Sequence, residues 1–140
     1  TQYKVVSWDF TTDKMASVNI QTAAETVTEV YGYEGNDVST LAMSVSYVGT
    51  DGGKGKLSSN GQYAQYNKNT QITIPVLKGD VVTVVSYPGQ SKYTITCGSD
   101  VVESDTATDT DTITAAADGE VVILATGGAY IYSITLESTK

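Results

Sequence analysis

The chain has 140 residues and a mass of 14.8 kDa, the size of one ordinary domain with a single hydrophobic core. Its eight basic residues are all lysine and face 16 acids, so the net charge of −8 disfavours non-specific binding to nucleic acid or to an anionic membrane. Histidine is absent and Cys97 is the only cysteine, which excludes Ser-His-Asp and Cys-His catalysis, an intramolecular disulfide and the common zinc sites. We expect a single domain over residues 1–140, a mature soluble monomer without a leader segment and without a cofactor.

Apolar and polar residues alternate with a period of two along most of the chain, which is the pattern of half-buried β-strands. The alternation predicts strands at 4–10, 26–33, 41–48, 70–76, 80–87, 92–96, 119–126 and 130–136. Turn-type residues separate them at spacings typical of sandwiches. We therefore predict an all-β fold, an antiparallel and jelly-roll-like β-sandwich.

The first and last of these strands are each predicted to turn one apolar face inward and to pair side by side. In the first strand this face carries Trp8, which makes Trp8 a core residue rather than an exposed platform for a sugar. The inward residues of the first strand are Val6, Trp8 and Phe10. Those of the last strand are Tyr130, Tyr132, Ile134 and Leu136.

Two segments depart from the alternation. Residues 15–26 are compatible with a short helical turn. Residues 102–112 form a Thr/Asp run, which we expect to be a solvated loop or an edge strand. The alternative is a structural calcium loop, because Asp105, Asp109 and Asp111 supply hard oxygen ligands, although the spacing and glycine of an EF-hand are missing.

The stretch GKGKLSSNGQYAQYNKNT, residues 53–70, is basic, aromatic and rich in amides. Residues 51–92 carry a net charge of +3, which leaves −11 for the remainder of the chain. A sugar presents an apolar face of C–H groups and a rim of hydroxyls, so its site needs aromatic rings surrounded by amide or charged groups. The candidate ligand-binding residues are Lys54, Lys56, Asn60, Gln62, Tyr63, Gln65, Tyr66, Asn67, Lys68, Tyr87 and Lys92.

The same residues also have a purely structural interpretation. A strand through the second half of the stretch would place Tyr63 and Tyr66 on opposite faces, so at least one of these rings would pack inward. Pro88 favours a turn with Gly89 at a position of positive φ, which leaves Tyr87 near a loop tip. The sequence does not decide whether this loop lies beside the basic stretch.

Four motifs, in the order VSWDF, GKLSSNGQYAQYN, TQITIPVLKGDVVTVVSYPG and ATGGAYIYSITL, carry a family resemblance over most of the chain. They resemble the non-catalytic β-sandwich modules that are appended to pectinases and other secreted polysaccharide-degrading enzymes of gut and rumen Firmicutes. The resemblance implies a carbohydrate-binding module that holds a covalently linked catalytic domain on plant polysaccharide. It also implies a bacterial protein that is extracellular, either secreted or at the cell surface.

We expect the ligand to be pectin, chiefly homogalacturonan with few methyl esters, because its uronates would pair with the lysines. The alternatives are a neutral glucan such as starch or β-glucan, and a structural or adhesion domain without affinity for glycans. We expect no enzymatic activity, since nothing in the spacing of the available acids selects a catalytic pair. The acids considered are Glu34, Asp51, Asp80 and Glu103.

Overall fold

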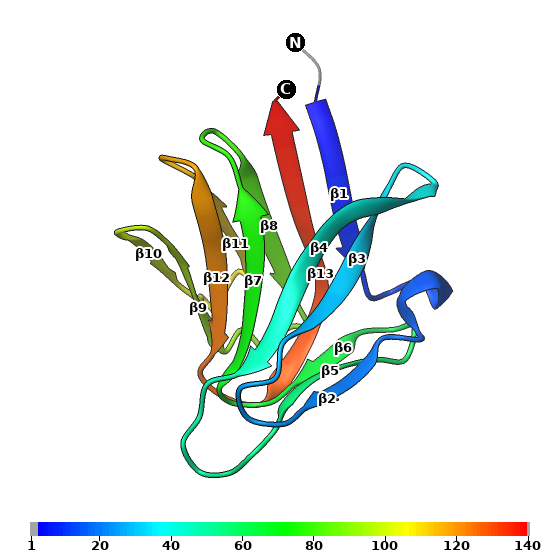
Figure 1. Ribbon diagram of the computed structural model, residues 1–140, viewed down its shortest axis with the longest axis vertical. Helices are drawn as coiled ribbons and strands as arrows, with labels where there is room; N and C mark the ends of the chain where they lie inside the picture. Colours follow the sequence, from blue (N-terminus) through cyan, green and yellow to red (C-terminus); the bar gives the residue numbers. More distant parts are fainter. Residues whose placement is uncertain (1–2, 140) are drawn as a thin grey trace.

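A computed structural model describes residues 3–139 and confirms that the fold is all-β (Figure 1). A 3₁₀ turn, η1 (Asp13–Met15), follows the first strand. The strands are β1 (Tyr3–Asp9), β2 (Asn19–Thr22), β3 (Thr28–Glu34), β4 (Asp37–Tyr47), β5 (Gly55–Ser59), β6 (Ala64–Tyr66), β7 (Thr70–Val76), β8 (Val81–Ser86), β9 (Tyr93–Cys97), β10 (Asp100–Glu103), β11 (Thr110–Thr114), β12 (Gly119–Ala125) and β13 (Ala129–Thr139). Within residues 3–139, no helix has the length and apolarity needed to cross a bilayer.

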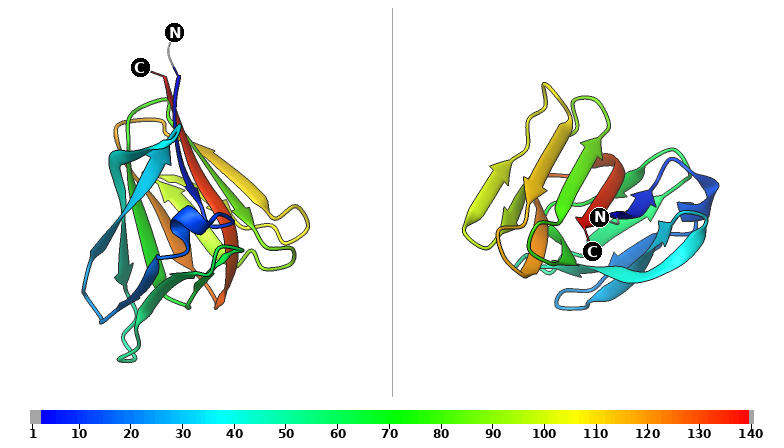
Figure 2. Two further views of the ribbon diagram at one scale, coloured as in Figure 1. Left: turned by 90° about the vertical axis from the view of Figure 1, so that its right-hand side faces the viewer. Right: turned by 90° about the horizontal axis from the view of Figure 1, so that it is seen from above.

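The strands pair antiparallel in the order β10-β9-β12-β7-β4-β3-β1-β13-β6-β5-β2, with β8 joining β13 and β11 joining β8. This path folds over where β1 meets β3, so two layers face each other (Figure 2). The β7 layer contains β10, β9, β12, β7, β4 and β3. In the β13 layer, β8 lies along one edge of β13 while β1 and β6 share the other edge. The result is an antiparallel, jelly-roll-like sandwich.

The two terminal strands pair side by side, as predicted. Trp8 lies opposite Ile134, and both side chains are buried in the core between the layers. The Trp8 indole is 0% exposed and its Nε1–H donates to the Val30 carbonyl at 3.1 Å. A Cβ on Gly32 would lie 2.8 Å from the indole, so no larger residue fits at position 32. The prediction that Trp8 belongs to the core is confirmed.

The prediction for the inward face of the last strand is correct for two of its four residues. Ile134 and Leu136 are buried, but Tyr130 and Tyr132 lie on the outer face, and Ile131 takes the inward place between them. The cause is an irregularity in the pairing of β13 with β8 between Ile131 and Ser133, which shifts the alternation by one residue. The irregularity leaves both tyrosines on the surface of the β13 layer.

The alternation found the eight strands β1, β3, β4, β7, β8, β9, β12 and β13, and missed five. Three of the missed strands, β2, β5 and β6, form a hairpin-like extension of the β13 layer. Half of the basic stretch, nine of its 18 residues, therefore lies in strands. The helical turn expected in 15–26 is η1, which overlaps that range only at Met15, and the middle of the range forms β2.

The Thr/Asp run lies where we expected it, at the edges of the sheet. The run contributes to β10 and β11, which are edge strands, and to the exposed loop between them. Cys97 is buried in β9 as a small apolar residue.

Both termini lie at one end of the sandwich, the upper end in Figure 1. At the other end, turns that are distant in sequence are joined by backbone hydrogen bonds. Val48 N–H donates to the Asn69 carbonyl at 3.0 Å, Asn69 N–H to Ala125 at 3.0 Å, and Thr126 N–H to Lys92 at 2.9 Å. We call this end the loop end; it is formed by residues 48–54, 67–69, 87–92 and 126–128.

Candidate functional site

Four tyrosines gather on the outer face of the β13 layer close to the loop end. The ring centroids of Tyr63 and Tyr130 are 4.5 Å apart, and Tyr87 lies 5.9 Å from each of those two rings. Tyr132 extends the group, with its centroid 5.5 Å from that of Tyr87. We call these four residues the tyrosine cluster. It presents a contiguous aromatic surface outside the core.

The backbone of three neighbouring strands brings these rings together. Ile131 of β13 pairs with Ala64 on one side and with Ser86 on the other. Tyr63, just before Ala64, and Tyr87, just after Ser86, therefore flank β13 from opposite edges. The irregularity after Ile131 adds the two tyrosines of β13 between them. Neighbouring strands lie about 4.8 Å apart, which is within the reach of such large side chains.

The loop that carries Tyr87 is held firmly in place. Gln90 N–H donates to the Tyr87 carbonyl at 2.9 Å and Gly89 has a φ of 76°, so the predicted turn is confirmed. The Asp109 carboxylate accepts from Gly89 N–H at 3.0 Å and from Ser91 Oγ at 2.9 Å. This loop lies beside the basic stretch, because Tyr87 contacts Tyr63. The sequence alone does not decide this.

A polar strip continues the cluster across the adjoining strands. Gln65 lies directly opposite Tyr130, so their Cβ atoms are about 5 Å apart. Gln65 Oε1 accepts a hydrogen bond from Lys56 Nζ at 2.9 Å. One strand further, Ser58 Oγ donates to Asn19 Oδ1 at 2.8 Å. An ammonium group is thus held one strand away from the aromatic surface.

Three further lysines lie at the loop end. Lys54 and Lys68 are exposed in neighbouring turns, which are linked by a hydrogen bond of 3.4 Å from Asn67 Nδ2 to the Lys54 carbonyl. Lys92 is also exposed and lies along Gly127, since a Cβ there would be 3.1 Å from Lys92 Cδ. Lys78, the fifth lysine of the +3 segment, lies in a turn between β7 and β8 with its N–H bonded to Asp118.

Tyr66 is not available to a ligand, and its inward packing confirms that one tyrosine of the stretch belongs to the core. Its side chain is 3% exposed, and burial raises the pKa of its hydroxyl to about 12. The hydroxyl donates to the Gln90 carbonyl at 2.9 Å and accepts from Lys92 N–H at 3.2 Å. Tyr66 therefore supports the loop that carries Tyr87 and Lys92.

The remaining amides of the stretch have different environments. Asn60 Oδ1 accepts from Gln62 N–H at 2.9 Å and from Tyr63 N–H at 3.3 Å, so Asn60 fixes the turn that presents Tyr63. Gln62 is exposed in that turn, next to the tyrosine cluster in sequence. Asn67 is half-buried and ties two turns of the loop end together, as described above.

An aspartate fixes the longest turn of the loop end. Asp51 Oδ1 accepts hydrogen bonds from the Tyr47 hydroxyl and from Gly53 N–H, the latter at 2.9 Å. The bond from Tyr47 is the main cause that lowers the pKa of Asp51, and the same bond raises the pKa of Tyr47. The positive charge of Lys68 lowers the pKa of Asp51 further.

The acids considered for calcium have separate structural contacts. Asp109 holds the Tyr87 loop, and Asp105 accepts from Ala107 N–H at 2.8 Å. Asp111 is buried and accepts from the Tyr93 hydroxyl at 2.7 Å; burial and this hydrogen bond raise the pKa of Tyr93. Among residues 3–139, no group of three or more acidic or cysteine side chains is arranged to hold a metal ion.

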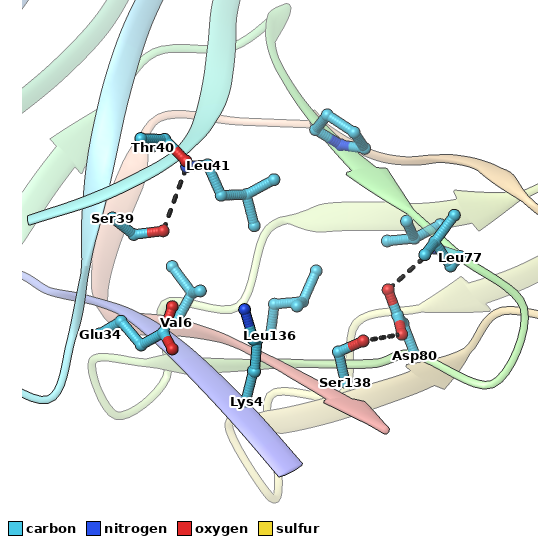
Figure 3. Close-up of a pocket in the computed structure, with 12 residues that line it drawn as sticks. Lys4, Val6, Glu34, Ser39, Thr40, Leu41, Leu77, Asp80, Leu136 and Ser138 are labelled. Carbon is cyan, nitrogen blue, oxygen red and sulfur yellow. Dashed lines mark hydrogen bonds between the residues drawn. The ribbon is translucent and has the colours of Figure 1, made fainter. Parts of the chain in front are cut away.

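A cavity of about 400 Å³ opens between the layers at the end near the termini (Figure 3). Its apolar lining includes core residues such as Val6 and Leu136, and its polar lining includes Lys4, Glu34 and the buried Asp80. None of the candidate ligand-binding residues lines it.

Two of the acids considered for catalysis, Glu34 and Asp80, line this cavity from opposite sides (Figure 3), and Asp80 has a structural role. Asp80 is 4% exposed, and its two oxygens accept from Leu77 N–H at 2.8 Å and from Ser138 Oγ at 2.6 Å. These bonds tie the turn after β7 to the end of β13.

The sequence pattern does not identify Tyr130 and Tyr132 as candidate site residues. The motif AYIYSITL is apolar on both faces near its start, so alternation alone assigns neither face to the core. Ile131 is the signal that could have revealed the outward position of these tyrosines. In a strict alternation it would share the outward face with Ser133 and Thr135, where an aliphatic residue is out of place.

Comparisons with known proteins give little further information. No family model matches the chain, and a search of curated proteins finds no relative. Among solved structures, the chain is similar to a crystal structure from Salmonella typhimurium described as an ethanolamine utilization protein q. The two share 8% identity over 84% of this chain and 96% of that chain, with a TM-score of 0.35. At that TM-score the likeness carries no argument about fold or function.

Proposed function

We propose that this protein is a non-catalytic carbohydrate-binding module that holds an attached extracellular enzyme on plant polysaccharide. The observation that supports this proposal most directly is the meeting of Tyr63 and Tyr87 with two further tyrosines on an exposed surface. Aromatic rings next to amide and ammonium groups are the chemistry that a sugar needs, since its C–H face packs on rings while its hydroxyls bond to the rim.

The polysaccharide that we propose is pectin, best represented by homogalacturonan. Four of the five lysines in the +3 segment lie at the loop end or on the strand beside it, although the protein as a whole has a charge of −8. A polyuronate gives such a group of ammonium charges a partner. The alternative ligand is a neutral glucan, which the tyrosine cluster would bind with Gln65 and Gln62 at its rim.

Titration of polygalacturonate and of soluble starch at two salt concentrations tests both ligands. Binding to polygalacturonate should weaken as salt rises, because the Debye length falls from about 30 Å at 0.01 M to about 10 Å at 0.1 M. An exposed ion pair contributes only about 0–1 kcal/mol, so Lys56→Ala should weaken binding modestly, and Lys56→Ala with Lys92→Ala should weaken it by up to about thirtyfold. Lys78→Ala is the matched control and should have no effect.

The outcomes separate the candidate functions. Salt-insensitive binding to starch alone would replace pectin by a neutral glucan. Retention of neither polymer, nor of other plant polysaccharides, would leave a structural or adhesion domain. Release of reducing sugar by the purified protein, lost when one acid is replaced, would contradict the non-catalytic role.

A further inference from the structure

We propose that the site has two halves with different preferences, and that it recognises a pectic chain where charged uronates adjoin uncharged units with an apolar face. A methyl-esterified galacturonate is one such unit. The aromatic half is the tyrosine cluster, and the cationic half is formed by Lys56 with the lysines of the loop end. This inference rests on the proposed function and adds the pattern of charge along the ligand.

The aromatic half has the properties of a surface for uncharged rings. Tyr87 is 39% exposed and the other three tyrosines are half-buried, so their rings contact one another rather than the core. The faces of phenol rings carry negative potential, and a carboxylate placed on them would lose water without gaining a partner. A methyl ester removes that charge and adds a methyl group that packs on the rings.

The relative orientation of the rings favours a single chain over a flat crystalline surface. Tyr63 and Tyr87 meet at 84°, Tyr87 and Tyr130 at 68°, and Tyr63 and Tyr130 at 46°. Rings at such angles form a ridged surface rather than one plane. A flexible chain can fit its sugar units between ridges, whereas a flat array of parallel chains would touch only the edges.

The cationic half begins immediately beside the aromatic half. Gln65 is the cross-strand neighbour of Tyr130 and accepts from Lys56 Nζ at 2.9 Å. One chain that crosses β13, β6 and β5 therefore meets rings first and an ammonium group next, over a path of about 10 Å given the spacing of neighbouring strands. A fully charged chain places carboxylates on the rings, and a fully neutral chain leaves the lysines without partners.

The test is calorimetric titration with two galacturonate oligomers of the same length, one fully de-esterified and the other with part of its carboxyl groups methyl-esterified. Wild-type protein should bind the partly esterified oligomer more tightly. Tyr63→Ala and Tyr87→Ala should weaken binding of that oligomer about tenfold and binding of the de-esterified oligomer by less than about twofold. Lys56→Ala should weaken both. Tyr31→Ala, which removes a tyrosine that is 48% exposed on β3 in the other layer, is the matched control and should change neither.

Equal affinity of the wild type for the two oligomers, or equal losses for both in the tyrosine variants, would overturn this inference and leave the proposed function standing. Binding to neither oligomer would overturn this inference together with pectin as the ligand, and the starch titration then decides whether the protein binds glycans at all. Melting curves identify any variant that fails to fold, and Tyr132→Ala, at the margin of the cluster, then replaces it with the same expectations.

Discussion

Tyr66 offers the clearest test of whether a candidate residue contacts the ligand or only supports the site. The sequence places it among the candidate contacts, whereas its ring is buried and its hydroxyl bridges Gln90 and Lys92. Replacing Tyr66 by Phe keeps the ring in the core and removes only the hydroxyl. The variant therefore isolates the two hydrogen bonds that hold the Tyr87 loop.

The magnitude follows from those two bonds. Each intramolecular hydrogen bond contributes about 0.5–1.5 kcal/mol net, and the groups left behind cost more when water cannot reach them. Here both hydrogen bonds are only partly buried, which keeps this additional cost small. We expect Tyr66→Phe to lower the free energy of unfolding by about 1–2 kcal/mol, and the melting temperature by about 4 °C for each kcal/mol.

Urea unfolding and glycan titration of the same samples test this expectation. Stability should fall as stated, and affinity should fall severalfold because the loop with Tyr87 and Lys92 becomes more mobile. Tyr31→Phe removes an exposed hydroxyl and should leave stability and affinity unchanged. A Tyr66→Phe protein that unfolds like wild type but no longer binds would show that the hydroxyl contacts the ligand, and our account of Tyr66 would be wrong.

Two further predictions concern the fold. Trp8→Ala should lower the free energy of unfolding by about 3–5 kcal/mol, because the indole is fully buried and donates to Val30; a variant that melts like wild type in differential scanning calorimetry yet fails to bind would contradict the core assignment. The pKa values of Tyr66 and Tyr93 are raised above the ordinary 10.0, to about 12 for Tyr66, so the stability from burying these neutral phenols is complete below pH 10 and is lost as pH rises through the folded-state values. Urea midpoints measured from pH 8 to pH 12 should fall only at the alkaline end in wild type, and an unchanged midpoint would refute this account.

The pKa of Asp51 is shifted in the opposite direction to those of Tyr66 and Tyr93. Because it is lowered from 3.8, the contribution of Asp51 to holding residues 48–54 is present above that value and is lost as pH falls through the lower folded-state value. Acid therefore releases this turn only below about pH 4, and the loop end keeps its structure in mildly acidic solution.

The alternation of apolar and polar residues predicts some of the strands and misses others. Alternation encodes one buried face, so it identified β1 and the core position of Trp8. It failed in β13, where both faces of AYIYSITL are apolar and one irregularity in pairing decides which side faces out. The strands β5 (GKLSS) and β6 (AQY) were missed because they are short and contain no β-branched residue, so their pairing is fixed by neighbouring strands rather than by local preference.

The site was predictable in its chemistry and not in its geometry. The composition of the basic stretch selected Tyr63 and the turn at Pro88 selected Tyr87, but nothing local in the sequence indicates that two rings 24 positions apart touch across β13. The same holds for Lys56 and Lys92, which the strand order brings to one end of the sandwich. Burial of Tyr66 was anticipated only as one of two alternatives, because the phase of a three-residue strand cannot be read from three residues.

The central claim is that a plant glycan binds on the tyrosine cluster and the adjoining lysines, away from the cavity at the terminal end. Two-dimensional NMR of isotope-labelled protein titrated with a galacturonate oligomer tests it residue by residue. The account predicts that amide signals shift at residues 54–68, 87–92 and 126–132, while those around Lys4, Glu34 and Asp80 stay in place. Shifts confined to the residues that line the cavity, or no shift with any plant oligosaccharide, would contradict it.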